Sequence, residues 1–489
     1  MKPQYRYIYF GLALVLFILF VISFWDYSID DAFITFRYAE HFADGHGMVF
    51  NVGDEPVEGY SNFLWLLLLA ALYKLGLPTY LCAKLFGVLL TALAGGIWFW
   101  HYRHDESPWA WLAGTLYLVA PITAFWAVSG LELGLYSCAL AGGLTAFRRR
   151  SYWSLPCLAI MVLSRPEGFV IGFVMIIVAV AVEYFRGEWH SRYVLANALT
   201  LVFATALIMI FRLVVFGYIF PNTYYAKSGG VEYGFATLLE MLTYFLPLSG
   251  LFLAGIVVVI RDRLHDKTLT LAVSLFVVQA IISSLVDPVM NFNFRYLAPF
   301  LPLFILVGAL VVSRYNTRLL KAVLVVAGLS LLTPYATVTA TIANEKTVMS
   351  AQKDLIAWID GLPPDAVISI TDIGRIPYYT DQRYHDIWGL VSEDIGQHGF
   401  NPLDEYFRFP DYFVLVGHFD DRGHITLRFG RERLISKCRG FNTTYRYAGI
   451  STPPGADIHK FGYYYIRLKK DQQAVDSLMT NHPPTRIRN

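Results

Sequence analysis

Long apolar runs separated by short polar or basic turns dominate the first 340 residues of the chain. A helix needs about 20 mainly apolar residues to cross the roughly 30 Å hydrocarbon core of a bilayer. On this basis eleven stretches are expected to span a membrane: 7–25, 79–101, 109–128, 131–147, 153–164, 168–185, 193–217, 236–260, 268–286, 297–313 and 319–341. The pattern therefore predicts a polytopic α-helical membrane protein.

Composition supports a membrane protein and excludes other classes. Of the 489 residues, 56% are hydrophobic and 16% charged, with a mean hydropathy of +0.47. Soluble domains contain roughly 25% charged residues. The net charge of +2 is too small to indicate a nucleic-acid partner. The four cysteines show no metal-binding spacing, so free thiols are expected.

Basic residues in the short loops predict the orientation of the helices. Cytoplasmic loops are enriched in Lys and Arg. The basic clusters are Lys2 and Arg6, His101 to His104, Arg148 to Arg150, Arg186 and Arg192, Arg261 to Lys267, and Arg314 to Lys321. They all fall on one side only if the apolar run 62–77 does not span the membrane. We therefore expect 62–77 to form an interfacial or re-entrant helix, and the other connections to lie on the opposite, outer face.

The chain changes character after residue 344. Periodicity predicts a helix over 351–360 and strands over 366–370, 412–416 and 463–468. We therefore expect a transmembrane domain over 1–344, with its first periplasmic loop at 26–78, followed by a periplasmic α/β domain over 345–489.

Two adjacent carboxylates, Asp30 and Asp31, follow the first expected span. An acid beside the hydrocarbon is suited to act as a general base on a sugar hydroxyl, or as a ligand for a divalent cation. The alternative is structural, because Asp30 would also serve as the N-cap of the following helix. The pattern alone leaves both interpretations open.

Other polar residues of the expected outer face are candidate substrate contacts. Arg37 suits a carboxylate or phosphate. Glu58 and Asn62 flank the interfacial helix, where capping is the alternative role. Arg295 lies on the expected outer face, although Lys and Arg are enriched in cytoplasmic loops, so it is a candidate phosphate contact. The alternative is that its long side chain reaches from the hydrocarbon to the polar membrane surface. Two further candidates are Asn222, in a Phe-Pro-Asn turn, and Asp372, after an expected strand.

Arg165 and Glu167 follow an expected span of only about 12 residues, or about 18 Å of helix. Their turn is therefore expected below the membrane surface, where charged groups are costly and usually functional. Together with Glu132 they are assigned to substrate binding. The alternative is a structural ion pair of Arg165 with Glu132 or Glu167.

The first loop resembles a known enzyme family. The string DDAFITFRYAEHFADGHGMVFNVGDEPVEGYSNFLW, residues 30–65, is similar to the first outer loop of the GT-C membrane glycosyltransferases. Within that superfamily it most resembles the terminal β-arabinofuranosyltransferases of mycobacterial cell-wall synthesis. Further matches are Trp126 to Glu132, Leu163 to Gly168, Arg212 to Lys227, Phe294 to Pro299 and Thr371 to Tyr379. The chain departs from the pattern at Glu132-Leu133, where relatives have Glu-Thr, and at 287–294, which lacks a Gly-Gly-Asp.

The resemblance implies a polyprenyl-phosphate sugar donor, a glycan or glycoconjugate acceptor of the cell envelope, and transfer on the periplasmic side. It places the catalytic base at Asp30 or Asp31, and arabinofuranose is the expected sugar. No cofactor is implied with certainty, and a divalent cation stays open. Transfer by a single displacement would invert the anomeric centre.

Two alternatives belong to other classes. A glycolipid transporter or flippase would also be polytopic, but its charges should lie near the midplane within inverted repeats. A non-catalytic envelope assembly protein would not need paired aspartates beside a buried Arg and Glu set.

Overall fold

The computed structural model describes residues 3–105, 107–187, 190–226, 231–262, 264–285, 291–460 and 462–481. Backbone contacts divide the chain into two compact units. The helical unit comprises 1–28, 61–214 and 227–342, and the sheet unit comprises 29–60, 215–226 and 343–489. The first loop is therefore grouped with the C-terminal residues, while the domain boundary expected at 344 stays a prediction.

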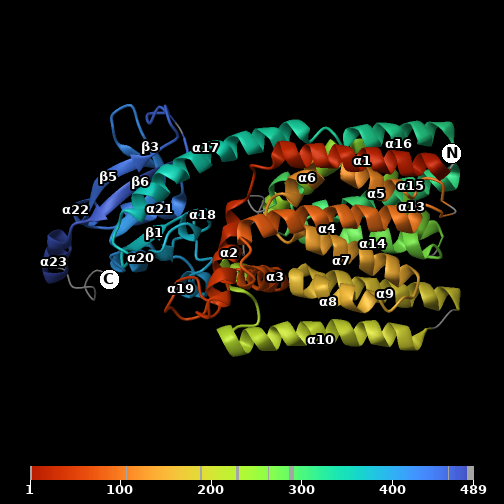
Figure 1. The fold of residues 1–489 in the computed structure, drawn as a ribbon, viewed down its shortest axis with the longest axis horizontal. Coiled ribbons are helices and arrows are strands. Elements are labelled where there is room, and N and C mark those ends of the chain that lie inside the picture. The colour runs from red at the N-terminus through yellow and green to blue at the C-terminus, as the bar shows by residue number, and fades with distance from the viewer. Residues whose placement is uncertain are drawn as a thin grey trace. The chain divides into compact units, whose positions relative to one another are not determined.

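The helical unit is built from helices that coincide with the apolar runs of the sequence (Figure 1). Its elements are α1 (Pro3–Phe24), α3 (Phe63–Lys74), α4 (Thr79–Tyr102), α5 (Leu112–Val119), α6 (Pro121–Ala127), α7 (Leu133–Arg148), α8 (Ser154–Ser164), α9 (Glu167–Arg186), α10 (Ser191–Phe216), α12 (Val231–Tyr244), α13 (Leu246–Arg261), α14 (Lys267–Ser284), η1 (Phe292–Phe294), η2 (Ala298–Phe300), α15 (Leu301–Tyr315), α16 (Arg318–Ser330) and the start of α17 (Tyr335–Asp360).

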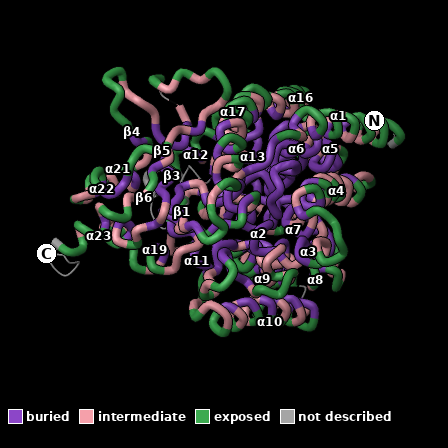
Figure 2. Tube along the Cα trace, turned by 60° about the vertical axis from the view of Figure 1, so that its left-hand side comes forward, coloured by how far each residue is buried: buried purple, intermediate pink, exposed green. Residues whose placement is uncertain are grey.

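Among the described residues, seven helical segments are long and apolar enough to cross a membrane, or eight if the bent pair α12–α13 is one span. Large apolar residues of α10 and α16 are exposed, and Figure 2 colours parts of both helices as exposed. The protein is a multi-pass membrane protein, as the composition predicts.

The expected count of eleven spans is not confirmed, and two expected spans are broken. The run 109–128 divides into α5 and α6 at Ala120, which is extended because Pro121 follows it. The run 236–260 bends by 106° between α12 and α13, where Pro247 stands in the first turn of α13. Helices α7 and α8, with 16 and 11 residues, are also shorter than a full span.

Helix α3 contains 12 residues, or about 18 Å of helix. It is too short to cross the bilayer, as expected for the run 62–77.

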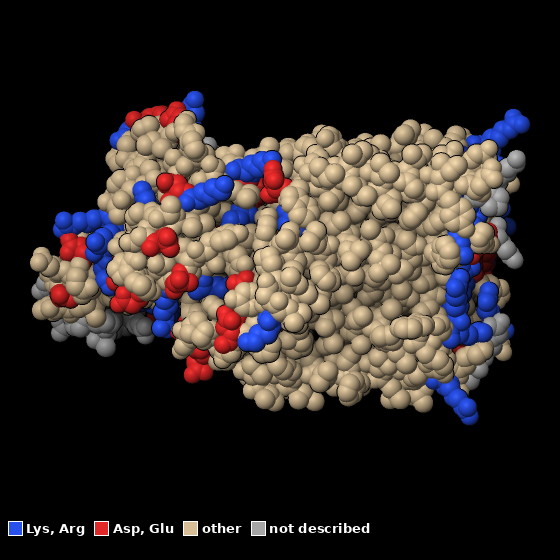
Figure 3. All heavy atoms as spheres, viewed as in Figure 1, with Lys and Arg blue, Asp and Glu red and all other residues tan. Residues whose placement is uncertain are grey.

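Basic side chains gather at one end of the helical unit, around the N-terminus of α1 (Figure 3). The loops contact one another there. Arg6 donates to the carbonyl of Arg103, and Arg148 pairs with Asp105 at 2.5 Å. Arg186 donates to the carbonyl of His265 at 3.0 Å. Basic clusters far apart in the sequence therefore share one end, as the charge pattern predicts.

The described residues of the sheet unit form a six-stranded sheet in the order β2-β1-β3-β6-β5, with β4 paired to β3. The strands are β1 (Val367–Ile370), β2 (Arg383–Asp386), β3 (Tyr412–Phe419), β4 (Ile425–Leu427), β5 (Tyr445–Ser451) and β6 (Tyr464–Lys470). β1 runs parallel to β2 and β3, whereas β6 is antiparallel to β3 and to β5. The fold class is confirmed: a helical membrane protein with a C-terminal α/β domain.

Short helices complete the sheet unit. They are α2 (Asp30–Ala43), α11 (Asn222–Ala226), the end of α17, α18 (Arg375–Tyr378), α19 (Glu393–His398), α20 (Pro402–Phe407), α21 (Gly430–Ser436), α22 (Phe441–Thr444) and α23 (Gln472–Asn481). A core that includes Phe413, Leu415 and Ile466 lies on one face of the sheet. Of the segment 287–294, in which the sequence departs from the family pattern, residues 287–290 lie outside the described residues.

Candidate active site

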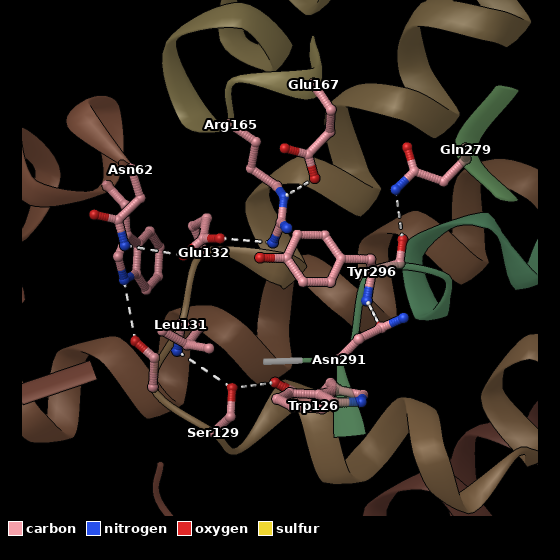
Figure 4. A network of polar contacts seen from close by, with 12 residues as sticks. Asn62, Trp126, Ser129, Leu131, Glu132, Arg165, Glu167, Gln279, Asn291 and Tyr296 are labelled. Atoms are coloured by element: carbon pink, nitrogen blue, oxygen red, sulfur yellow. Dashed lines mark hydrogen bonds and ion pairs between the residues drawn. The ribbon is translucent and has the colours of Figure 1, made fainter. Parts of the chain in front are cut away.

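A buried charge cluster occupies the break between α8 and α9 of the helical unit (Figure 4). Arg165 is extended at the end of α8, and Pro166 starts the next helix. The Arg165 Nε donates to Glu167 Oε1 at 2.6 Å, and its Nη1 donates to Glu132 Oε1 at 2.7 Å. All three side chains are at most 9% exposed. The turn thus holds one guanidinium between two carboxylates inside an apolar unit.

Neighbouring polar groups extend this cluster on the side of α3. The Asn62 amide donates to Glu132 Oε2 at 2.9 Å, so both oxygens of that carboxylate accept a hydrogen bond. The Trp65 indole donates to the carbonyl of Gly130 at 3.1 Å. Gly130 has a φ of +89°, a conformation that favours glycine. These contacts hold the 129–132 turn, and with it Glu132, in place.

The segment around Arg295 borders the same cluster. The ring of Tyr296 lies 4.9 Å from the Arg165 guanidinium carbon. The Tyr296 carbonyl accepts from the Gln279 amide at 3.0 Å, and its N–H donates to the Asn291 side chain at 3.1 Å. Arg295 itself is buried, at 8% exposure. Four of the predicted residues, Asn62, Glu132, Arg165 and Glu167, are thus in contact, and Arg295 adjoins the residue that faces Arg165.

The ion pairs that the sequence left as the alternative role of Arg165 are both present. Because two of its nitrogens are engaged by carboxylates, Arg165 is held in one orientation. Arg165 would therefore bind a ligand through its remaining N–H groups without changing its orientation.

The paired aspartates lie in the sheet unit, at the start of α2. Asp30 is the first residue of the helix and not its N-cap, which is Ile29. The two Asp30 oxygens accept the backbone N–H groups of Gly374 and Arg375 at 3.0 and 2.9 Å. Loss of contact with water raises the pKa of Asp30. Asp31 is half-buried. Asp30 thus ties the first loop to the segment after β1.

Asp372 lies in that segment and is held by two tyrosines. Its carboxylate accepts from the Tyr463 and Tyr465 hydroxyls at 2.8 and 2.6 Å. Loss of contact with water, reinforced by the nearby Asp30 charge, raises the pKa of Asp372 to about 7. The structure therefore brings Asp30 and Asp372, which are 342 positions apart, close enough to repel.

Arg375 balances these acids. Its guanidinium donates to Glu345 Oε1 at 3.2 Å and to the Gln352 side chain, and it stands 4.9 Å from the centre of the Phe33 ring. Glu345 and Gln352, both on α17, were not found by sequence reasoning. The only available signal was helical spacing, since residues seven apart lie on one face.

The remaining predicted residues of the sheet unit have structural contacts. Arg37 donates to the carbonyls of Phe50 and Thr380 at 2.8 and 2.9 Å and to that of Pro377. The Asn222 amide donates to the carbonyls of residues 389, 390 and 392, and its N–H donates to the carbonyl of Glu58 at 3.1 Å. Arg37 and Asn222 therefore hold loops together, and their substrate-binding roles stay predictions.

Metal binding is limited in the described part of the chain. No group of three or more His, Cys, Asp or Glu side chains there is arranged to hold a metal ion.

Comparisons with known proteins identify the fold. Residues 340–471 match a family described as a domain of unknown function, DUF8728. No curated protein matches. The chain is similar to the crystal structure of ArnT from Cupriavidus metallidurans bound to undecaprenyl phosphate, with a TM-score of 0.60 and 13% identity over 97% of this chain and 99% of that one. The apo state of ArnT gives a TM-score of 0.56 and 13% identity over 96% and 98%. The fold is therefore the GT-C fold of ArnT.

Proposed function

We propose that the chain is a membrane glycosyltransferase that takes its sugar from a polyprenyl-phosphate donor. The observation that carries this proposal is the match to ArnT over almost the whole of both chains, in a structure that binds undecaprenyl phosphate. We infer that the reaction takes place on the side opposite the basic loops, the periplasmic face of a bacterial inner membrane, because cytoplasmic loops are enriched in Lys and Arg.

The proposed general base is Asp31. Its neighbour Asp30 accepts a backbone N–H on each oxygen, so we assign Asp30 to positioning the start of α2. Asp31 follows it in the first helical turn, where the partial positive charge of the helix end favours an ionised carboxylate. A general base of this kind contributes about 10²- to 10⁴-fold to the rate.

The proposed contact for the donor phosphate is the buried cluster of the helical unit. Arg165 is oriented by Glu132 and Glu167, and Arg295 would add a second guanidinium. A guanidinium group can donate two parallel hydrogen bonds to a phosphate. A charged group at membrane depth is energetically costly, so its presence there indicates a functional site. Neutralising the lipid phosphate makes it a competent leaving group without protonation.

The reaction would be a single displacement. Asp31 removes the proton of the acceptor hydroxyl, the oxygen attacks the anomeric carbon, and the bond to the phosphate oxygen breaks. The configuration inverts, so an α-linked donor gives a β product. Arabinofuranose is the proposed sugar and an envelope glycan or glycoconjugate the proposed acceptor, both from the resemblance of the first loop.

The test is transfer from synthetic polyprenyl-phosphate sugars by the purified chain and its variants. We expect Asp31→Asn to lower kcat by at least 100-fold with an unchanged Tm. Asp30→Asn should lower both activity and Tm, since it weakens two hydrogen bonds. The control is Asp44→Asn, an exposed position at the end of the same helix.

The same assay decides the open points. Full activity of Asp31→Asn would remove the base assignment, and no transfer by the wild-type chain from any tested donor would remove the proposed function. Assays with EDTA and with added Mg²⁺ test the divalent cation.

A further inference from the structure

The membrane-facing surface of the helical unit carries an apolar groove away from the candidate active site. It has a volume of about 460 Å³ and lies between α1, α5 and α16. Its walls include Leu16 of α1, Leu116 of α5, and Gly328 of α16. Figure 1 shows α1 and α16 running side by side. The flanking side chains Leu12 and Val325 are 60% and 65% exposed, so the groove opens toward lipid.

The dimensions of the groove match one leaflet of a bilayer. Its lining runs from Lys321 of α16 to Leu332, in the turn just after that helix, a rise over eleven steps of about 16 Å. This is about half of the 30 Å hydrocarbon core. Beyond it, the Tyr335 ring lies 5.7 Å from the Phe20 ring and 6.1 Å from that of Phe24. These aromatic contacts hold the start of α17 against the end of α1, so the groove does not continue along the last turns of α1.

The open end of the groove is positively charged. Lys321 lines it, and Arg318 lies one turn earlier at the start of α16. This is the end at which the basic loops gather (Figure 3). Basic groups beside a cleft between transmembrane helices attract anionic lipid headgroups, with about 1 kcal/mol for each Lys or Arg near the surface.

We propose that this groove binds one acyl chain of an anionic phospholipid from the leaflet on the side of the basic loops, with its phosphate at Lys321. The apolar walls accept the chain, the depth stops it at the bilayer midplane, and the cation selects the headgroup. The site is distinct from the buried Arg165 cluster, and the inference does not depend on sugar transfer.

The test is photo-crosslinking of the full-length chain in nanodiscs. The probes are phosphatidylglycerol and phosphatidylcholine with the same diazirine-bearing acyl chain, and the labelled peptides are identified by mass spectrometry. We expect labelling of α1, α5 and α16 about five-fold stronger with phosphatidylglycerol, which corresponds to about 1 kcal/mol for the one lysine.

Two variants separate the headgroup from the chain. Lys321→Gln should bring the two lipids to equal labelling, whereas Arg192→Gln, which removes an exposed charge at the start of α10, should not. Gly328→Leu should reduce labelling by both lipids several-fold, because a side chain there extends toward Leu116, 3.6 Å from the position of its Cβ. Gly250→Leu, on α13 with open space around it, is the control.

Several results would overturn the proposal. Equal labelling of the wild-type chain by both lipids would remove the anionic headgroup. Unchanged labelling of Gly328→Leu would remove the groove. A crosslink between two copies through α1 and α16, or displacement of the probe by polyprenyl phosphate only, would assign the groove to another occupant.

Discussion

Two pairs of buried acids, one pair in each unit, are held by different kinds of partner. In the helical unit Glu132 and Glu167 share the guanidinium of Arg165 at 2.7 and 2.6 Å, and all three are nearly inaccessible. In the sheet unit the equally buried Asp386 and Glu432 are held by neutral donors. Asp386 accepts the N–H groups of Trp388 and Val391, and Glu432 accepts from the Thr371 hydroxyl and the Val416 N–H.

The difference has a physical consequence. An acid bonded to a cation is stabilised in its ionised form, and removing the cation leaves an uncompensated charge. When a buried acid accepts hydrogen bonds from neutral donors only, its pKa rises instead, because burial disfavours the charged form. The pKa of Asp386 rises to about 6 and that of Glu432 to about 7, chiefly through burial. The two buried glutamates of the helical unit thus have a cationic partner, whereas Asp386 and Glu432 of the sheet unit have neutral partners and a pKa near neutral.

The largest expected effect comes from removing the shared cation. Arg165→Met leaves Glu132 and Glu167 buried beside each other, and breaking a buried pair in this way costs about 3–5 kcal/mol. We expect a Tm in detergent lowered accordingly. The triple variant Arg165→Met, Glu132→Gln, Glu167→Gln removes the charges together and should recover most of the loss. A single variant within about 1 kcal/mol of the wild type would contradict the picture of fixed charges.

The second-largest effect is a dependence of stability on pH that comes from Glu432, the acid held by neutral donors. The pKa of Glu432 in the folded chain, about 7, exceeds its ordinary value of 4.5, so the folded state binds the proton more tightly. Its contribution to stability is complete below pH 4.5 and is lost as the pH rises through 7. At about 1.36 kcal/mol per pKa unit, the chain should lose about 3 kcal/mol through this group between pH 5 and pH 8.

Glu432→Gln mimics the protonated form and should flatten this decline in Tm between pH 5 and pH 8. The exposed Glu55→Gln is the matched control in the same unit. An unaltered pH profile of the Glu432 variant would show that its neutral partners do not hold it protonated.

A smaller effect is expected where the two loops of the sheet unit meet. A Cβ at Gly374 would contact the carbonyl and the carboxylate of Asp30. Gly374→Ala should therefore force the segment after β1 away from α2 and cost about 1–3 kcal/mol. Gly361→Ala is the control, since its Cβ would meet only the Trp358 carbonyl at 3.5 Å, an ordinary contact. Equal Tm values for the two variants would show that the Asp30 contact is not tightly packed.

Most helices and strands of the fold could be predicted from local patterns in the sequence. The length of the apolar runs located the helices, and short apolar runs located β1, β3 and β6. The strand β2, with the polar sequence Arg-Tyr-His-Asp, has no such signal, because only Tyr384 and Asp386 of it are buried. The broken spans required the effect of Pro121 and Pro247 on the backbone, which a count of apolar residues does not include.

The candidate site could be predicted only where its members are close in sequence or lie in marked turns. Arg165 and Glu167 are two residues apart in a turn expected below the membrane surface, where burying charge costs free energy. An ion pair of Arg165 with Glu132 or Glu167 was one of the two interpretations. The contact of Asp30 with Gly374 and Arg375 joins residues more than 340 positions apart. No periodicity encodes such a contact, so the grouping of the first loop with the sheet became visible only in three dimensions.

The smallest effect is expected at a surface ion pair, which is the reference for both kinds of buried acid. Arg383 pairs with Asp54 at 2.5 Å, but the arginine side chain is 54% exposed. Because water and salt already solvate both charges, such pairs contribute about 0–1 kcal/mol. Arg383→Gln should therefore change Tm by no more than a degree or two, with less effect in 0.5 M salt. A loss as large as that of Arg165→Met would mean that the position of an ion pair relative to water does not set its energy in this chain, and the contrast between the two units would lose its physical basis.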